Sequence, residues 1–262
     1  MRLAITGKGG VGKSTLVALL ARVLRDAGQR VIAIDADPDM NLAALLGVPD
    51  ATKITPIIAY KELIAERTGT QVGKAAPLFT MNPRVDDIPE KFWVDCGGIK
   101  LLVMGTVSRG GGGCACPENA FLKALLGHLV LGRDEWVLLD MEAGIEHLGR
   151  GTAMGVDEMV VVVEPSRTSL ETASRIKGLA ADLRIRRLRL VGNKIRGAED
   201  RQFLEEGAKG LEFIGFLGQS EELRRMSMKG LSALGVGADA LRQVSEIVAN
   251  AGWAASIEAR AS

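Results

Sequence analysis

The chain has 262 residues, 47% of them hydrophobic, and its 33 basic and 32 acidic residues nearly cancel. This length can build one large α/β domain with a sizeable core. The balanced charge gives no electrostatic case for nucleic acid, and the aromatic content of 4% is too low for a base-stacking surface. No apolar stretch approaches the roughly 20 residues that cross a bilayer, and no room for a signal peptide precedes the first apolar run. We therefore expect a cytoplasmic protein without nucleic-acid or membrane partners.

A glycine-rich loop follows the first apolar run, residues 3–5, and precedes a helical pattern. Its spacing matches G-x-x-x-x-G-K-[ST], in which backbone N–H groups and the helix N-terminus surround a polyphosphate. We expect Lys13 to reach the β- and γ-phosphates and the hydroxyl of Ser14 to bind Mg²⁺. The residues predicted to bind the nucleotide in this loop are Gly7, Lys8, Gly9, Gly10, Val11, Gly12, Lys13, Ser14 and Thr15.

A second lysine, Lys8, directly follows the first glycine of this loop. With Lys8 there, the loop resembles the deviant Walker A motif of the MinD/ParA and nitrogenase-iron-protein class of P-loop ATPases. The resemblance implies a Mg²⁺-dependent ATPase, converting ATP and water to ADP and phosphate, that is coupled to homodimer formation. In that class the lysine reaches the phosphates bound by the other subunit, where its charge acts as an arginine finger does. A solvated loop charge is the alternative for Lys8.

Short apolar runs and helical patterns alternate along the rest of the chain. Between them, residues 48–98 mostly carry loop and turn signals, such as Ile88-Pro89. The alternation implies an α/β fold, a P-loop NTPase with a mostly parallel central sheet and helices on both faces. We expect one domain over residues 1–262. Strands are predicted at 3–5, 31–35, 99–104, 136–140, 159–163, 188–191 and 211–216, and helices at 16–27, 41–46, 57–66, 121–129, 167–182, 199–208, 220–229 and 238–251.

Carboxylates follow two of the predicted strands. Asp140 matches a Walker B acid, which holds Mg²⁺. The segment 35–39 contains three aspartates, and the resemblance favours Asp37 as the one that orients or deprotonates the attacking water. Asp35 and Asp39 are its competitors, although Asp35 is also placed to cap its strand and Asp39 to be the N-cap of the helix at 41–46. We take Lys8, Lys13 and Asp37 as the catalytic residues.

The turn after the strand at 188–191 contains Asn193 and Lys194 and is typical of a base-reading segment. GTPases carry an Asp two positions after this lysine, and its carboxylate accepts hydrogen bonds from guanine. Here that position is Arg196, which cannot accept a hydrogen bond. We therefore expect ATP rather than GTP, with Asn193 and Lys194 among the nucleotide-binding residues. A plain strand-to-helix turn is the alternative.

Cys114 and Cys116 form a Cys-x-Cys pair in a glycine-rich loop inserted around residues 109–119. Because such a pair makes a strained disulfide, it more often offers thiolates to a metal such as Ni²⁺ or Zn²⁺. Pro117 suits the first position of a helix, whose N-terminus would favour the thiolate of Cys116. Since Lys8 implies a dimer, the partner can supply the second pair of a four-thiolate site. Two ordinary loop cysteines are the alternative. We expect Cys96 to be structural and His128 to be packed or solvated, and His147 is a weak candidate for sensing nucleotide.

Three stretches together resemble the CooC-type ATPases, which help insert nickel into carbon monoxide dehydrogenase. They are the loop with Lys8, residues 110–119 and residues 140–151, and weaker similarity extends over 82–92 and 163–166. The resemblance implies that ATP drives dimerisation, that Cys114 and Cys116 of both subunits bridge one nickel ion, and that hydrolysis releases it to a client. The client would be carbon monoxide dehydrogenase or the related acetyl-CoA synthase. Many relatives have a proline where this chain has residues 215–218.

The main alternative is a MinD/ParA-like ATPase switch in positioning or partitioning, without metal delivery. A MinD-like protein would carry a basic amphipathic helix at its C-terminus, whereas residues 241–262 contain few large apolar side chains. An iron-protein-like reductase would need two well-separated cysteines, one of them after the switch that follows Asp140. No cysteine follows Cys116, so this reading fails.

Overall fold

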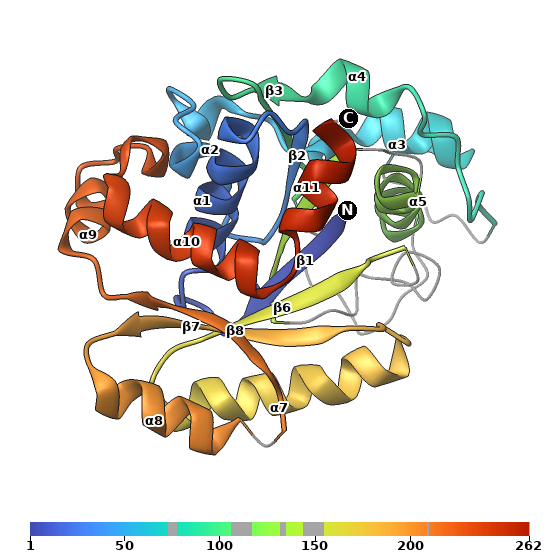
Figure 1. Cartoon of the computed structure of the whole chain (residues 1–262). Coiled ribbons are helices and arrows are strands. Elements are labelled where there is room, and N and C mark those ends of the chain that lie inside the picture. Colours follow the sequence, from blue (N-terminus) through green and yellow to red (C-terminus); the bar gives the residue numbers. More distant parts are fainter. Residues whose placement is uncertain (73–77, 106–116, 132–134, 144–154, 209, 262) are drawn as a thin grey trace.

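The computed structural model describes residues 1–72, 78–105, 117–131, 135–143, 155–208 and 210–261. An eight-stranded sheet with the order β3-β4-β2-β5-β1-β6-β7-β8 forms its centre (Figure 1). Its neighbouring strands pair in parallel, except for β3, which runs antiparallel to β4 at one edge. The strands are β1 (Arg2–Gly7), β2 (Val31–Ala36), β3 (Val94–Asp95), β4 (Ile99–Val103), β5 (Trp136–Met141), β6 (Glu158–Val163), β7 (Leu188–Ile195) and β8 (Phe213–Gly218).

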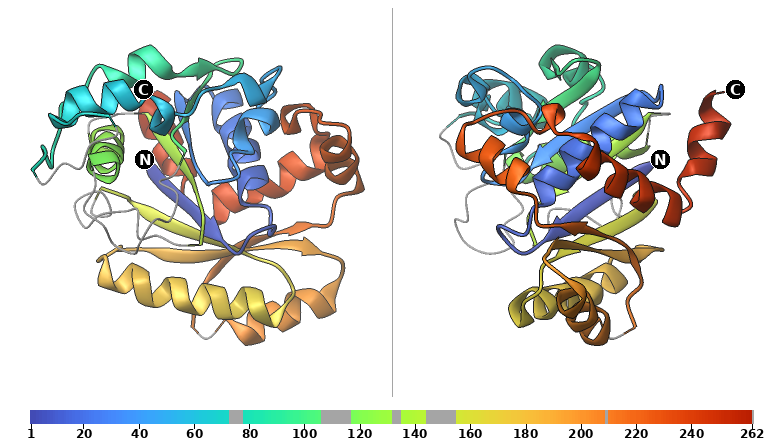
Figure 2. Two further views of the ribbon diagram at one scale, coloured as in Figure 1. Left: turned by 180° about the vertical axis from the view of Figure 1, so that it is seen from behind. Right: turned by 60° about the vertical axis from the view of Figure 1, so that its left-hand side comes forward.

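Helices cover both faces of the sheet, as the sequence predicted. Figures 1 and 2 show α7 and α8 together on the opposite side of the sheet from α1 and α10. None of the described helices is long and apolar enough to span a membrane. The helices are α1 (Lys13–Asp26), α2 (Leu42–Leu45), α3 (Lys61–Thr68), α4 (Ile88–Phe92), α5 (Pro117–Leu131), α7 (Arg167–Asp182), α8 (Ala198–Gly207), α9 (Glu221–Met228), α10 (Ala238–Asn250) and α11 (Ala254–Ala261), with 3₁₀ turns η1 (Ala51–Lys53), η2 (Ile57–Ala59) and η4 (Ala233–Gly235).

The alternation of side chains along each strand divides the core into two layers. Leu3 and Ile5 of β1 are buried against α1 and α10, whereas Ala4 between them is buried against the layer of α5 and α7. The central strands are therefore apolar on both faces, which is typical of a parallel sheet covered by helices. This arrangement places the loop after β1 between β5 and β6, in the middle of the sheet edge.

The structure corrects the sequence prediction in the region 48–98. The helix expected at 57–66 is a 3₁₀ turn followed by α3, because Tyr60 between them has a non-helical ψ of 70°. Residues 88–95, read as turn signals and loop, form α4 and the edge strand β3. Pro89 lies in the first turn of α4, where proline costs no hydrogen bond, so it starts a helix here instead of marking a turn.

Candidate functional site

The glycine-rich loop between β1 and α1 has a backbone that only glycine adopts easily. Gly10 and Gly12 have φ angles of +79° and +98°, in the region that side chains disfavour. A Cβ on Gly7 would lie 2.4 Å from the carbonyl oxygen of Val162, so the close passage of the loop over β6 also requires glycine there. The first turn of α1 follows directly, and its N-terminal N–H groups are available to an anion.

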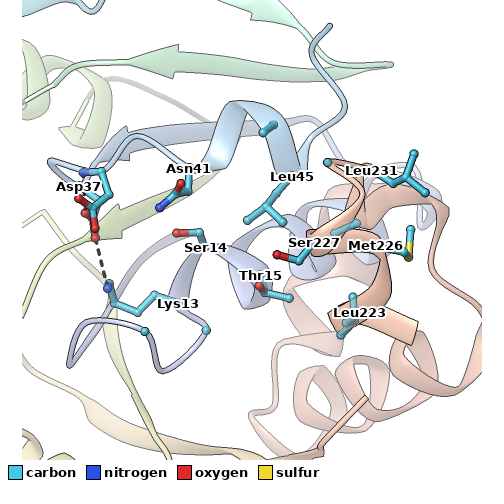
Figure 3. A pocket seen from close by; sticks show the side chains of 16 residues that line it. Lys13, Ser14, Thr15, Asp37, Asn41, Leu45, Leu223, Met226, Ser227 and Leu231 are labelled. Carbon is cyan, nitrogen blue, oxygen red and sulfur yellow. Dashed lines mark hydrogen bonds and ion pairs between the residues drawn. The ribbon is translucent and has the colours of Figure 1, made fainter. Parts of the chain in front are cut away.

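A cavity of about 450 Å³ opens beside this loop. Figure 3 shows its elongated form, with Lys13 and Asp37 at one end and the apolar side chains of α9 and the following segment at the other. Three parts of the chain form its walls: the loop with the start of α1, the segment from β2 to α2, and the segment from α9 to η4. The lining residues are Gly10, Gly12, Lys13, Ser14, Thr15, Asp37, Asp39, Asn41, Ala44, Leu45, Leu223, Met226, Ser227, Gly230, Leu231 and Ala233.

Lys13 and Asp37 form a buried ion pair at the polar end of the cavity. The ammonium nitrogen lies 3.2 Å from Oδ2 of Asp37, and the two side chains are 7% and 10% exposed (Figure 3). The other oxygen of Asp37 accepts a hydrogen bond from the N–H of Asp39 at 3.0 Å. The structure thus brings together Lys13 and Asp37, two of the three residues predicted to be catalytic.

Asp35 organises the backbone of this segment. Its carboxylate accepts hydrogen bonds from the N–H of Asp37 at 3.2 Å and from the N–H of Leu42 at 3.0 Å. Burial raises the pKa of Asp35 to about 6, although these two bonds favour its charged form. The prediction that Asp39 caps the following helix is wrong, because the N-cap residue of α2 is Asn41. The side chain of Asn41 makes no capping bond, and the carboxylate of Asp35 accepts the N–H of Leu42 in the first turn instead. Asp39 instead lines the cavity.

Asp140 lies at the carboxyl end of β5, in register with Asp35 on β2 and Ile5 on β1. It is fully buried, and neither of its carboxylate oxygens has a hydrogen-bond partner within the described part of the chain. Burial raises the pKa of Asp140 to about 7, and the nearby Ser14 hydroxyl and Lys13 ammonium only partly oppose this effect.

An unsatisfied buried carboxylate close to Ser14 fits a magnesium site. The described residues contain no group of three His, Cys, Asp or Glu side chains arranged to hold a metal by themselves. Mg²⁺ usually takes one or two protein ligands, with the remainder from phosphate and water. The site therefore has the donor set expected of a Mg²⁺–nucleotide complex, and the predicted pair of Ser14 and Asp140 fits it.

Lys8 points away from this cavity. Its ammonium group donates a hydrogen bond of 2.8 Å to the hydroxyl of Thr168, in the first turn of α7. Lys13 lines the cavity beside the glycine-rich loop, whereas Lys8, from the same loop, does not. The two lysines of the loop therefore point to different places: Lys13 to the cavity and Lys8 to the first turn of α7.

Asn193 and Lys194, predicted to bind the nucleotide, contact the back of the glycine-rich loop. The side-chain amide of Asn193 donates to the carbonyl of Val11 and the ammonium group of Lys194 to the carbonyl of Gly10, both at 2.7 Å. Neither side chain lines the cavity, so their contact with a base stays a prediction. Arg196 donates from Nε to Gln219 at 2.6 Å, on the surface.

The apolar end of the cavity was not anticipated from the sequence. Leu223 and Met226 of α9 and the nearby Leu231 line it, together with Leu45 of α2. The available signal was the spacing of Leu223 and Met226, which lie on one face of a predicted helix whose other residues are polar except for Met228. Neither apolar residue is fully buried, which is unusual for a helix that contributes only to a core.

Several predicted residues fall outside this part of the structure. Cys114, Cys116 and His147 lie outside the described residues. Pro117 is the first residue of α5, as predicted, and His128 is half-buried within that helix. Cys96 is buried, and burial raises the pKa of its thiol to about 11, in agreement with a structural role.

The fold and the loop define a nucleotide-binding protein. The family model of the CobQ/CobB/MinD/ParA nucleotide binding domain matches residues 3–233, so the chain belongs to this family of P-loop ATPases. It is 49% identical over 234 residues to the carbon monoxide dehydrogenase accessory protein CooC of Rhodospirillum rubrum, covering 88% of this chain and 89% of that protein. It is also 46% identical to an uncharacterized ATP-binding protein of Methanocaldococcus jannaschii, with 88% and 90% covered.

Solved structures share the fold. The septum site-determining protein MinD of Pyrococcus horikoshii, complexed with Mg-ADP, superimposes with a TM-score of 0.67 over 98% of both chains. MinD of Aquifex aeolicus does so with a TM-score of 0.66 over 96% of both. The identities of 18% and 20% mean that these likenesses concern the fold alone. The predicted α/β P-loop architecture is confirmed, as is the resemblance to the CooC-type branch.

Proposed function

We propose that the chain is an ATP-hydrolysing metallochaperone that binds nickel at a dimer interface and helps insert it into carbon monoxide dehydrogenase or the related acetyl-CoA synthase. The observation that carries this proposal is the 49% identity to the accessory protein CooC over nearly the whole of both chains. The Cys114-x-Cys116 pair adds support, because thiolates suit nickel as cargo.

ATP would bind with its phosphates at the polar end of the cavity. Lys13 would then leave Asp37 for the β- and γ-phosphates, which carry more negative charge. The freed carboxylate of Asp37 would be available to orient or deprotonate the attacking water. Ser14 and Asp140 would hold Mg²⁺, which when bound neutralises charge on the phosphates.

The other end of the cavity suits the base. Leu45, Leu223, Met226 and Leu231 provide an apolar slot, and Ser227 is a polar group within it (Figure 3). Base-binding pockets are commonly apolar with a few polar groups that fix orientation. Since Arg196 replaces the guanine-reading carboxylate of GTPases, the proposed nucleotide is ATP.

Dimerisation would give Lys8 its role. In the single chain its only described hydrogen bond is to the neutral hydroxyl of Thr168, and breaking such a bond costs about 1–3 kcal/mol. A phosphate of the nucleotide in the partner subunit would be a stronger acceptor for an ammonium group. Lys8 would therefore act across the interface and couple ATP binding to association of the two subunits.

The described contacts also suggest how nucleotide binding could be coupled to the geometry of the cysteine pair. Met104, near the end of β4, donates its N–H to the carbonyl of Asp35 at 2.9 Å. On the other side of the Cys-x-Cys segment, Glu118 in the first turn of α5 pairs with Lys61 of α3 at 3.8 Å. The segment thus follows directly from the strand that contacts Asp35. A movement of residues 35–39 upon ATP binding would shift its first residues and alter the spacing of the thiolates.

A maturation assay tests the proposal. Nickel-free carbon monoxide dehydrogenase is incubated with the purified chain, Ni²⁺ and ATP, and its CO oxidation activity is measured, with nickel-free acetyl-CoA synthase assayed in parallel. The wild-type chain should activate one of the two clients, whereas Lys13→Ala and Cys114→Ala/Cys116→Ala should not. The Cys96→Ala variant is the matched control and should remain active. Equal activation by the double cysteine variant would overturn delivery through these cysteines. Activation of neither client by the wild type would favour a MinD/ParA-like switch.

A further inference from the structure

The end of β7 holds the back of the glycine-rich loop through two consecutive side chains. Asn193 binds the carbonyl of Val11 and Lys194 binds the carbonyl of Gly10, each at 2.7 Å. Asn193 is itself oriented, because its side-chain oxygen accepts the N–H of Lys194 at 2.8 Å. These contacts join the loop to a segment more than 180 residues away in the sequence.

These bonds fix which way the loop's amide groups point. In a planar trans peptide the carbonyl of one residue and the N–H of the next point in opposite directions. Because Asn193 holds the Val11 carbonyl on the β7 side, the N–H of Gly12 is directed to the other side, and Gly12 lines the cavity. A Cβ on Gly12 would lie 2.3 Å from Nδ2 of Asn193, so this approach also requires the glycine.

Lys194 is held in a costly conformation. Its φ of +61° lies in the left-handed region, which residues with a side chain rarely adopt. Its ammonium group bridges the Gly10 carbonyl and the carboxylate of Glu164, again at 2.7 Å. Glu164 directly follows β6, and its N–H donates a hydrogen bond of 3.1 Å to the hydroxyl oxygen of Ser169 in α7. The lysine is thus fixed from both sides.

We propose that Lys194, with Glu164 as its counter-ion and Asn193 beside it, is a positioning residue for the phosphate loop and does not read the base. By holding the carbonyls of Gly10 and Val11 outward, Lys194 and Asn193 preorganise the backbone of the loop, including the N–H of Gly12 that is directed to the cavity side. This inference requires that the loop bind a nucleoside phosphate and does not depend on metal delivery.

Nucleotide affinity separates this role from base recognition. The dissociation constants of ATP and GTP with Mg²⁺ are measured by titration for the wild type, Lys194→Met, Lys194→Arg and Glu164→Gln. Loss of a charged hydrogen bond predicts that Lys194→Met weakens both nucleotides by about tenfold or more, with the ATP-to-GTP ratio unchanged. Lys194→Arg should recover most of the affinity, and Glu164→Gln should lose less than Lys194→Met.

The matched control is Lys91→Met, which breaks a Lys–Asp pair of the same 2.7 Å length in α4. It should leave both affinities unchanged. Since the Lys194–Glu164 pair is partly exposed, its removal should shift the thermal unfolding midpoint by only a degree or two. A changed ATP-to-GTP ratio would assign base reading instead and overturn the proposal. Unchanged affinities, or a loss of affinity that follows only from unfolding, would overturn it as well.

Discussion

The ammonium group of Lys13 lies 3.2 Å from a carboxylate oxygen of Asp37. This buried pair joins the phosphate loop to the segment after β2, and each partner neutralises a charge that would otherwise be costly to bury. A nucleotide must therefore take Lys13 from Asp37 to gain its full contact with the loop. This exchange links phosphate binding to the position of the residue proposed to act on water.

Asp37→Asn should separate binding from hydrolysis. The amide keeps the shape of the side chain but cannot accept a proton, so the rate of ATP hydrolysis should fall about a hundredfold or more. The affinity for ATP should be unchanged or higher, because Lys13 no longer has a charged competitor for the phosphates. Phosphate release and ATP titration measure the two quantities.

Asp39→Asn is the control for this substitution, since Asp39 lines the same cavity and was a candidate for the same role. It should hydrolyse ATP at close to the wild-type rate. An equal loss of the hydrolysis rate in both variants would contradict the specific role of Asp37 toward the attacking water. A wild-type rate in Asp37→Asn would contradict it as well.

The Asp140 carboxyl should make the metal-free protein less stable as pH rises. Its pKa is about 7 in the folded chain against about 3.9 in an unfolded one, so between these values the folded state binds a proton that the unfolded state lacks. The free energy of unfolding from this group therefore falls as pH increases through this window and is constant above it. Asp35, with a pKa of about 6, acts in the same direction.

Urea unfolding in EDTA checks this effect. Asp140→Asn, which cannot ionise, should be more stable than the wild type at pH 8 by on the order of a few kcal/mol. The difference should narrow by up to about 1.4 kcal/mol per pH unit between pH 7 and pH 4. A difference that is the same at pH 8 and pH 5 would contradict the assignment.

Local signals carried most of the fold prediction. The helix expected at 167–182 is α7, Arg167–Asp182. Its apolar periodicity and its N-cap residue, Ser166, both depend only on residues close together in the sequence. Likewise, the glycine spacing around Lys13 specifies the loop directly. The sequence signal at Pro89 was misinterpreted, because proline is common both in turns and in the first turn of a helix.

Contacts between distant segments could not be predicted in this way. The capping of α2 by Asp35 depends on how the chain turns after β2. The part of the cavity wall formed by Leu223 and Met226 depends on α9 lying at the same cavity as α2, which is about 180 residues away in the sequence. The pattern around Asn193 did not predict its hydrogen bond to the backbone of the phosphate loop, because only the packing of β7 beside β6 places it there.

A buried polar cluster should hold the C-terminal helices in place. Arg189 of β7 binds Glu158 of β6 through two hydrogen bonds and the carbonyl of Ala251 at 3.0 Å, and the indole N–H of Trp253 donates to Glu158 at 3.1 Å. Arg189→Met leaves Glu158 buried without its counter-charge and should cost about 3–5 kcal/mol of unfolding free energy. Chemical denaturation measures this loss.

The double variant Glu158→Gln/Arg189→Met should recover much of that loss, because it removes the buried charge as well. Arg242→Met, which breaks only exposed pairs with Asp239 and Glu246, should change stability by less than about 1 kcal/mol. If Arg189→Met is no more harmful than Arg242→Met, the cluster does not hold these helices.

The three cysteines should differ in reactivity. Cys96 is buried and its thiol has a pKa raised to about 11 by burial, so at pH 8 less than about 1% of it is thiolate, the reactive form. Labelling with an alkylating reagent, followed by peptide mass spectrometry, should modify Cys114 and Cys116 much faster than Cys96. Added Ni²⁺ should protect the pair. Fast labelling of Cys96 would contradict its structural role.

Nickel stoichiometry tests the central proposal most directly. Ni²⁺ binding to the reduced protein is measured by equilibrium dialysis with and without ATP, for the wild type, Cys114→Ala/Cys116→Ala and Cys96→Ala. We expect one ion per two chains in the wild type and in Cys96→Ala, a dependence of affinity on ATP, and no such binding in the double variant. Nickel binding that persists in the double variant, or none in the wild type, would contradict the proposed metallochaperone.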